Sequence, residues 1–319
     1  MSPMPSGENV QVSIVIVSWN VRQHLLACLH SVEEQTKGVS FDVTIVDNAS
    51  TDGTVEAVRR AFPRVHVIAN AENVGFARAC NQGIRETNGP HILLLNPDCL
   101  LSNDICTLMV QYLAARPGVG MLGPHIRQLD GADDLHSPRL LPTLWSDFCD
   151  RSGLADRFPR SRLVARHHMP DWDRSISGSV EGLSGACLML VRRALEQVGL
   201  FDEGFFMFGE DVDLCLRMRR AGWQVHYRGD AIVTHRGGAS TNQVRDSMVR
   251  HGLISRQRFF RKHRGPLYAL AHRAVNALLA VVKLLTLAPW SVITWRQRPR
   301  AYLQWQLLCL CLGMNHENP

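Results

Sequence analysis

The sequence of 319 residues is poor in aromatic residues and lacks any pattern that would indicate a disulfide framework. Aromatic residues make up 7% and charged residues 20%, whereas 45% are hydrophobic. Such a composition excludes a disordered or fibrous chain and fits a globular protein with a sizeable core. The nine cysteines are an odd number without a CxxC pair, which favours a reducing compartment. No charged-then-apolar signal segment begins the chain, so we expect a cytoplasmic protein.

Two glycine-rich nucleotide motifs are also missing from the expected places. No GxGxxG follows the first apolar run, and no GxxxxGK[ST] occurs. Their absence argues against a nicotinamide-dinucleotide enzyme and against a P-loop NTPase. A nucleotide bound by this chain would therefore have to be held by carboxylates and a metal ion.

What the sequence does contain is a series of short apolar runs that alternate with helical segments. The runs at Val12–Ser18, Phe41–Val46, Val65–Ala69 and His91–Leu95 are typical of buried strands. Their spacing predicts a mostly parallel α/β sheet with helices on both faces. Residues 128–179 have weak periodicity and are expected to form a loop-rich insertion. Further strands are expected at 185–191, 223–227 and 231–234.

Polar residues gather where these predicted strands end, and ligands of such sheets bind beyond the carboxyl ends of the strands. The polar residues in question are Ser18, Asn20, Asp47, Asn73, Asn96 and Asp98. We therefore expect a binding site at this edge. Asp52 follows Asp47 in a polar turn and is expected to cap the next helix, as Ser102 is expected to cap a later one.

One residue of this set, Asp98, and a histidine further along the chain, His235, could hold a divalent cation. Asp98 follows Pro97 at the end of a strand, where a carboxylate binds a hard cation or serves only as a turn residue; spacing alone leaves both open. His235 ends another predicted strand and would matter only beside Asp98, since imidazole with carboxylate suits Mn²⁺.

Three acids begin a predicted helix in the segment FGEDVDLCLRMRRAGW. Glu210, Asp211 and Asp213 could simply favour the helix N-terminus. They also follow Phe205, Phe206 and Phe208, which would desolvate their surroundings, and an acid in such surroundings is a candidate general base.

These motifs together resemble the inverting family 2 glycosyltransferases with the nucleotide-diphospho-sugar transferase (GT-A) fold. The resemblance covers roughly Val12 to Ser240 and rests on seven segments in the family's order. They are VSIVIVSWN, VDNASTDGT, NVGFARACNQG, LLLNPD, GACLMLVRR, GLFDEGFFMFGEDVDLCLRMRRAGW and VTHRGGAS. The long acidic block is most similar to the bacterial rhamnosyltransferase branch.

The resemblance implies roles for the donor-binding residues. Asp47 would recognise the pyrimidine base, with Ser18 and Asn20 near the nucleoside, while Asp52 and Asn73 would shape that pocket. Asn96 and Asp98 stand where the family has an Asp-x-Asp motif, and Asn96 is a departure that costs one charge.

The resemblance also implies the chemistry. Asp98 would bind Mn²⁺ or Mg²⁺ at the donor diphosphate, with His235 as a further metal ligand. Asp211 would be the general base, and Glu210 and Asp213 would support it. The favoured reaction is transfer of L-rhamnose from dTDP-rhamnose with inversion. A UDP-hexose or UDP-N-acetylhexosamine donor, or a non-catalytic membrane adaptor on the same fold, remains an alternative.

We accordingly expect a GT-A domain at 1–240, with a nucleotide-sugar-binding half at 12–125 and an acceptor and catalytic half at 126–240. Residues 241–319 are expected to form a basic, partly amphipathic helical tail. Between Ser240 and Arg300 there are 12 Lys or Arg and a single acid, whereas the rest of the chain is net negative.

The tail contains the apolar stretch Ala274–Ala288, about 22 Å long as a helix against roughly 30 Å of hydrocarbon. Lys283 and Pro289 argue against a membrane span. A helix in the membrane plane is favoured by the flanking bases, at Arg256–Arg264 and Arg296–Arg300, and by Trp290 and Trp295. A buried core helix is the alternative. We expect a protein peripheral to the cytoplasmic face of the inner membrane, with a lipid-linked or glycan acceptor and no nucleic-acid partner. The oligomeric state stays open.

Overall fold

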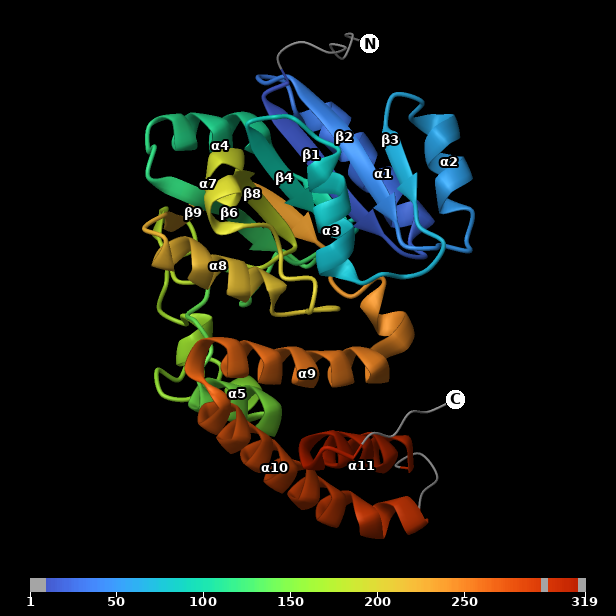
Figure 1. The fold of residues 1–319 in the computed structure, drawn as a ribbon, viewed down its shortest axis with the longest axis vertical. Coiled ribbons are helices and arrows are strands. Elements are labelled where there is room, and N and C mark those ends of the chain that lie inside the picture. Colours follow the sequence, from blue (N-terminus) through green and yellow to red (C-terminus); the bar gives the residue numbers. More distant parts are fainter. Residues whose placement is uncertain (1–9, 294–297, 315–319) are drawn as a thin grey trace. The chain divides into compact units, whose positions relative to one another are not determined.

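The structure is a computed structural model that describes residues 10–293 and 298–314, and its contacts divide the chain into two compact units (Figure 1). The first unit comprises Met1–Leu141 and Asp171–Gln243. The second comprises Pro142–Pro170 and Val244–Pro319. Residues 142–170, which we had assigned to the acceptor half, thus group with the C-terminal helices.

The first unit is built on one nine-stranded sheet in the order β3-β2-β1-β4-β8-β6-β9-β5, with β7 also paired to β9. Strands β1, β2, β3 and β4 run parallel, as do β6 and β9, whereas β8 runs antiparallel between β4 and β6. The strands are β1 (Val12–Ser18), β2 (Phe41–Asp47), β3 (His66–Ala69), β4 (His91–Leu95), β5 (Cys99–Leu101), β6 (Val119–Arg127), β7 (Gly178–Ser179), β8 (Cys187–Val191) and β9 (Gln224–His235).

Helices cover both faces of this sheet (Figure 1). Val12, Ile14 and Ile16 of β1 pack with α1, α2 and α4, whereas Val15 packs with α3, α7 and α8. Strand side chains alternate in this way because successive residues point to opposite faces. The predicted α/β fold class is confirmed. The helices are α1 (Arg22–Gln35), α2 (Thr54–Ala61), α3 (Phe76–Arg85), α4 (Ile105–Ala114), α7 (Arg192–Val198) and α8 (Glu210–Arg220).

Several local predictions differ from the structure. Strands β5 and β6 were not expected, and the two short strands predicted at 223–227 and 231–234 form the single strand β9, irregular against β6. Helix α4 is capped by Asp104, which accepts from the Thr107 amide, instead of Ser102. Asp52 lies one residue before Gly53, the N-cap of α2.

The second unit is helical. It contains α5 (Leu144–Ser152), α6 (Leu154–Arg157), the short 3-10 helix η1 (Arg166–His168), α9 (Arg245–Arg264), α10 (Pro266–Ile293) and α11 (Arg298–Leu312), and η2 (Thr241–Val244) leads into it. The expected insertion is therefore partly helical, and the expected helical tail is confirmed. Helix α10 continues through Pro289, where we expected an interruption. Trp290, Trp295 and the bases from Arg296 to Arg298 lie outside the described residues or side chains.

Within the described residues, one helix, over Pro266–Leu287, is long and apolar enough to cross a membrane by length and composition. Its ability to do so is limited by its polar residues, which include His272, Asn276 and Lys283. The side chains of His272 and Asn276 are buried inside the second unit.

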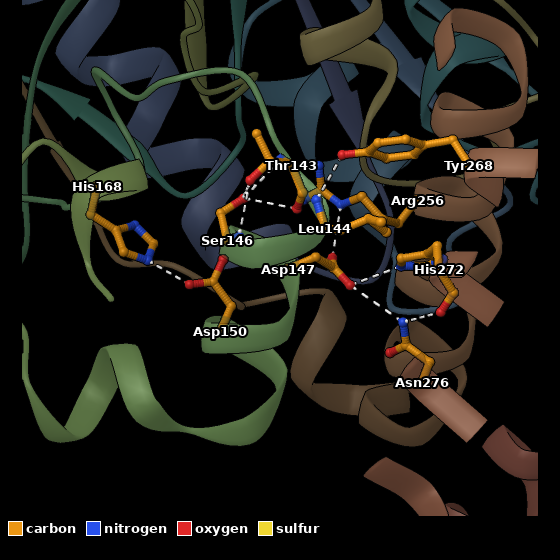
Figure 2. A network of polar contacts seen from close by, with 10 residues as sticks. All are labelled: Thr143, Leu144, Ser146, Asp147, Asp150, His168, Arg256, Tyr268, His272 and Asn276. Atoms are coloured by element: carbon orange, nitrogen blue, oxygen red, sulfur yellow. Dashed lines mark hydrogen bonds and ion pairs between the residues drawn. The ribbon is translucent and has the colours of Figure 1, made fainter. Parts of the chain in front are cut away.

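A buried polar network joins α5 to α9 and α10 (Figure 2). Asp147 lies 3.1 Å from Arg256 Nε and 2.8 Å from His272 Nε2. The amide of Asn276 donates to the His272 carbonyl over 2.9 Å. Tyr268 adds a further link by accepting the Leu144 amide proton. Since Asp147 is 6% exposed, these contacts hold a buried charge and connect two distant chain segments.

We expect acid to destabilise the second unit through Asp147. Burial alone would raise its pKa, but the hydrogen bond from His272 and the charge of Arg256 outweigh it and lower the pKa of Asp147 to about 2, from an ordinary 3.8. This stabilisation, about 2 kcal/mol, is full above the ordinary pKa and is lost as pH falls from about 4 to 2. Denaturant unfolding monitored by circular dichroism at several pH values should show the loss. A protein with Asp147→Asn should lack this part of the pH dependence, and an unchanged slope in that variant would contradict the assignment.

Candidate functional site

Two buried polar side chains lie at the carboxyl ends of neighbouring strands. Ser18 ends β1 and pairs in register with Asp47, which ends β2. One Asp47 oxygen, Oδ2, accepts the amide proton of Ser50 over 2.8 Å. Its other oxygen and the Ser18 hydroxyl are buried without a hydrogen-bond partner. Buried polar atoms without a partner are costly, so this strand edge is prepared for polar groups of a ligand.

The turn after β2 is fastened to the loop after β1. Asn20, in the left-handed region at φ 51°, accepts the Thr51 amide proton over 2.7 Å. Asp52 accepts from the Arg22 amide over 2.9 Å and from the Thr54 amide over 3.1 Å. Both side chains thus shape the strand edge, as expected of residues around a pocket.

The next loop connects this edge to the acidic helix. Asn73 accepts the amide proton of Gly75 over 3.0 Å, and Phe76 donates its amide proton to the Phe206 carbonyl over 2.7 Å. Gly75 has φ 86°, and a Cβ there would lie 2.7 Å from the same carbonyl oxygen. Only glycine allows this close approach, which fixes the segment before α8 against α3.

Asp98 and His235 lie side by side, which meets the condition under which His235 would matter. Asp98 Oδ1 lies 3.2 Å from His235 Nε2, and Asp98 Oδ2 accepts the Ala239 amide proton over 3.3 Å. A third side chain, Asp134, faces the other ring nitrogen, with its Oδ2 3.9 Å from Nδ1. The imidazole therefore sits between two carboxylates, and all three side chains are at most 15% exposed.

The charges in this cluster reinforce one another. Burial opposes a charged imidazole, but Asp134 and Asp98 outweigh it and raise the pKa of His235 to about 9. Burial likewise works against ionised Asp98, but His235 and the Ala239 amide lower the pKa of Asp98 below its usual range. In the absence of a cation, the cluster is therefore held together by an imidazolium between two carboxylates.

The donor set fits a divalent cation. His235 Nε2 lies 3.2 Å from Asp98 Oδ1 in an ion pair that lacks the alignment of a hydrogen bond, and Asp98, Cys99 and His235 form a group of ligand atoms within 4.8 Å of one another. The Cys99 thiol donates to the Ala186 carbonyl over 3.5 Å, and a thiolate is a soft ligand that suits zinc better than Mn²⁺ or Mg²⁺. A carboxylate and an imidazole remain, a combination that suits Mn²⁺.

Asn96 occupies a structural position beside this cluster. Its backbone N–H donates to the Ala186 carbonyl over 2.8 Å. Gly185, the residue before Ala186, donates its backbone amide proton to Asp211 Oδ2 over 3.0 Å. The dipeptide 185–186 thus joins the Asp98 loop to the acids of α8.

The three acids that begin α8 have different surroundings. Asp211 pairs with Arg139, whose Nη2 lies 2.7 Å from Oδ2, and its side chain is 10% exposed. Asp213 is fully buried, and its Oδ2 lies 2.7 Å from Arg217 Nε. Arg217 in turn donates to the carbonyls of Val198, Gly199 and Leu200. Asp213 therefore fixes α8 to the segment after α7.

Glu210 is buried, and its Oε2 has no hydrogen-bond partner. Burial and then the charge of Asp211 raise the pKa of Glu210 well above its usual range. Of the aromatic residues expected to desolvate the acids, Phe205 is buried but Phe208 is 41% exposed. The aromatic shielding is thus only partial.

Two charged residues of this region, Asp134 and Arg139, were missed in the sequence. Both lie between 128 and 179, where no periodic pattern marks them. Arg139 reaches the site because its backbone pairs with Gly182, a contact between residues distant in the sequence. The acidic residues Asp130, Asp133 and Asp134 indicate only a turn.

Comparisons with known proteins agree with this geometry. The sequence profile described as "Glycosyltransferase like family 2" matches residues 9–252. The chain belongs to glycosyltransferase family 2. The predicted family and transferase activity are thereby confirmed, and glycosyltransferase activity in glycan biosynthesis follows for this family 2 chain.

Individual relatives of this family 2 glycosyltransferase are distant. An N-acetylglucosaminyl-diphospho-decaprenol L-rhamnosyltransferase from Mycobacterium tuberculosis is 30% identical over 249 residues, covering 72% of this chain and 77% of that protein. A low-salt glycan biosynthesis hexosyltransferase from Haloferax volcanii is 26% identical over 214 residues, covering 66% and 62%. A mannosyltransferase from Pyrobaculum calidifontis, solved with GDP-Man and Mn²⁺, shares the fold, with a TM-score of 0.52 and 18% identity over 100% of this chain and 90% of that one.

Proposed function

We propose that this family 2 glycosyltransferase moves L-rhamnose from dTDP-rhamnose to a lipid-linked glycan acceptor, inverts the anomeric centre and acts in cell-surface polysaccharide biosynthesis. The observation that carries the proposal is the row of buried, partly unsatisfied polar groups at one sheet edge, from Ser18 and Asp47 to the Asp98–His235 pair. The name of the mycobacterial relative supports the choice of sugar and of a lipid-diphosphate acceptor.

In this proposal the nucleoside occupies the ends of β1 and β2. The second Asp47 oxygen and the Ser18 hydroxyl would form hydrogen bonds with polar groups of the nucleoside, and these bonds would give both buried atoms a partner. Asn20, Asp52 and Asn73 hold the surrounding loops through their backbone contacts. Asn96 connects this region to the α8 acids through residues 185–186.

Asp98 and His235 would hold Mn²⁺ or Mg²⁺. The cation, when bound, supplies positive charge against the diphosphate leaving group. Asp134 faces His235 Nδ1, so it would keep the proton on that nitrogen and leave Nε2 free for the metal. The Asp134 carboxylate would supply the negative charge that Asn96 lacks. It would do so through its contact with the His235 imidazole and not as a metal ligand.

Asp211 is the proposed general base. Its Oδ2 is held by Arg139 and the Gly185 amide, while Oδ1 accepts only the Val212 amide proton. Oδ1 would take the proton of the attacking hydroxyl as the new bond forms. Glu210, neutral beside it, avoids a second negative charge, and Asp213 keeps the helix start in place.

A peripheral position on the cytoplasmic face of the inner membrane completes the proposal. Helix α10 exposes an apolar face whose members include Leu278, 65% exposed, and Leu285, 70% exposed. Single exposed apolar residues are ordinary, but a continuous apolar face suits a lipid surface.

A panel of nucleotide sugars tests the donor. Thermal unfolding of the full chain with dTDP-rhamnose, UDP-hexoses or UDP-N-acetylhexosamines, each with and without Mn²⁺, should show the largest stabilisation by dTDP-rhamnose with the metal. A larger shift with a UDP-sugar would show that this nucleotide sugar, and not dTDP-rhamnose, is the donor. No shift with any of them would favour the membrane adaptor.

Asp98→Ala is expected to remove most of the metal-dependent part of donor binding. Loss of a group that only supports a metal ligand lowers metal affinity by about 10- to 100-fold, and loss of the Asp98 ligand itself should cost at least as much. Titration calorimetry of Mn²⁺ in the presence of dTDP would measure this. Asp230→Ala, a change of an exposed acid, serves as the control. Equal Mn²⁺ affinity in the two variants would remove Asp98 from the metal site.

A further inference from the structure

A cavity of about 150 Å³ lies inside the second unit between α5, α9, α10 and α11. Two cationic side chains, Arg151 and Lys283, line it together with the amides of Asn276 and Gln304. Its remaining wall is apolar: Val249, Leu279, Ala280 and Leu307. Pockets for whole drug-sized ligands measure roughly 300–1,000 Å³, so this cavity has room for a head group and not for a nucleotide sugar.

The charge of the cavity comes from its two cations. Asn276, 4% exposed, already donates through Nδ2 to the His272 carbonyl over 2.9 Å, so its amide forms part of the wall of the cavity. Lys283 Nζ donates to the Arg151 carbonyl over 2.6 Å, which brings the lysine to α5 without neutralising it. Within residues 10–293 and 298–314, neither Arg151 nor Lys283 forms an ion pair. The nearby carboxylate of Asp147 is already shared by Arg256 and His272.

Helix α10 has an unusual distribution of side chains for a helix in water. Its polar residues His272 and Asn276 face the interior of the unit, whereas its exposed face is apolar. The large exposed residues there are Leu267, Leu270, Leu278, Val281, Val282 and Leu285. A helix of a soluble protein normally shows the opposite arrangement. The cationic cavity therefore lies against a helix whose exposed face suits the acyl region of a membrane.

We infer that the cavity binds the anionic phosphate of a membrane lipid, while the outer face of α10 rests among the acyl chains. The inference rests on the proposed function insofar as a lipid-linked acceptor carries such a phosphate. Arg151 and Lys283 supply the charge, and the side-chain amide of Gln304 supplies hydrogen-bond donors. The apolar wall takes the first carbons of the lipid chain.

Vesicle binding by the full chain tests the inference. Phosphatidylcholine vesicles with and without a few per cent of polyprenyl monophosphate are compared, with neutral polyprenol as the matched additive. The phosphate is expected to increase binding, and Arg151→Gln and Lys283→Gln should each reduce that increase by about fivefold. Arg160→Gln, a change of an exposed arginine of the second unit outside the basic flanks of α10, should leave it intact. Arg151→Lys keeps the charge and should retain most of the binding.

The outcomes separate the possible sources and causes. Equal losses in the Arg151, Lys283 and Arg160 variants would mean general charge attraction and would overturn the pocket. Inorganic phosphate that binds as tightly as the lipid, with no gain from vesicles, would overturn the lipid source. Circular dichroism melting of each variant confirms folding, and if one glutamine variant unfolds, the other glutamine variant decides the matter. The nucleotide-sugar panel is run on the same variants. Loss of stabilisation by the donor would count against the proposed function. Binding of polyprenyl phosphate that the glutamine variants leave unchanged would count only against this inference.

Discussion

Asp211→Asn is expected to lower the rate of sugar transfer by about 10²- to 10⁴-fold, the usual contribution of a general base. The amide has no basic lone pair, so the attacking hydroxyl keeps its proton until later in the reaction. Donor binding should survive, because the residues proposed to hold the nucleoside and metal lie on other elements. Steady-state rates with dTDP-rhamnose and thermal shifts by the same donor measure the two effects separately.

Two further variants make this experiment decisive. Asp156→Asn, at an exposed position, should leave transfer unchanged. Glu210→Gln replaces a buried, neutral carboxyl with a group of the same shape and should cost far less activity than Asp211→Asn. If Glu210→Gln were the more damaging change, the base would be Glu210. Near-normal turnover in Asp211→Asn would exclude Asp211 from proton transfer.

Asp147→Ala is expected to destabilise the second unit by about 3–5 kcal/mol, because it breaks the buried ion pair with Arg256 and removes the carboxylate that the buried His272 imidazole contacts. The side chains of Asp147 and Arg256 are 7% and 21% exposed. Equilibrium unfolding in urea, followed by circular dichroism, should therefore show an early transition for the helical unit.

Asp150→Ala on the same helix is the matched control. Asp150 pairs with His168 at 3.0 Å, but its side chain is 32% exposed, and such pairs contribute about 0–1 kcal/mol. The Asp147 variant should thus unfold at a clearly lower urea concentration than the Asp150 variant. Coincident transitions would show that the Asp147 network adds little stability.

The first half of the fold could be predicted because its signals are local. Strands β1, β2 and β4 are continuous apolar runs separated by short helices, and this pattern allows few topologies. Ser18 and Asp47 come together for the same reason, since parallel strands end at one edge. The contact between Asp98 and His235 was a conditional expectation, and pairing of β5 with β9 brings them together.

The second half could not be predicted to the same degree because its structure depends on distant contacts. Strand β6 contains Gly120, Gly123 and Pro124, which weaken a strand pattern. A Cβ at Gly123 would lie 2.6 Å from Leu183, so the glycine is needed for packing that the local sequence does not reveal. Asp134, Arg139 and the α5 network likewise acquire partners from far along the chain.

The second unit is assembled from two separate stretches of the chain, 142–170 and 244–319. Cutting the chain after residue 243 would consequently leave α5 behind, with the Asp147 carboxylate and its packing surface deprived of α9 and α10. The C-terminal helices are not an appendage that recombination can exchange between related enzymes in one piece. A chimera that keeps a working helical unit has to transfer both stretches together.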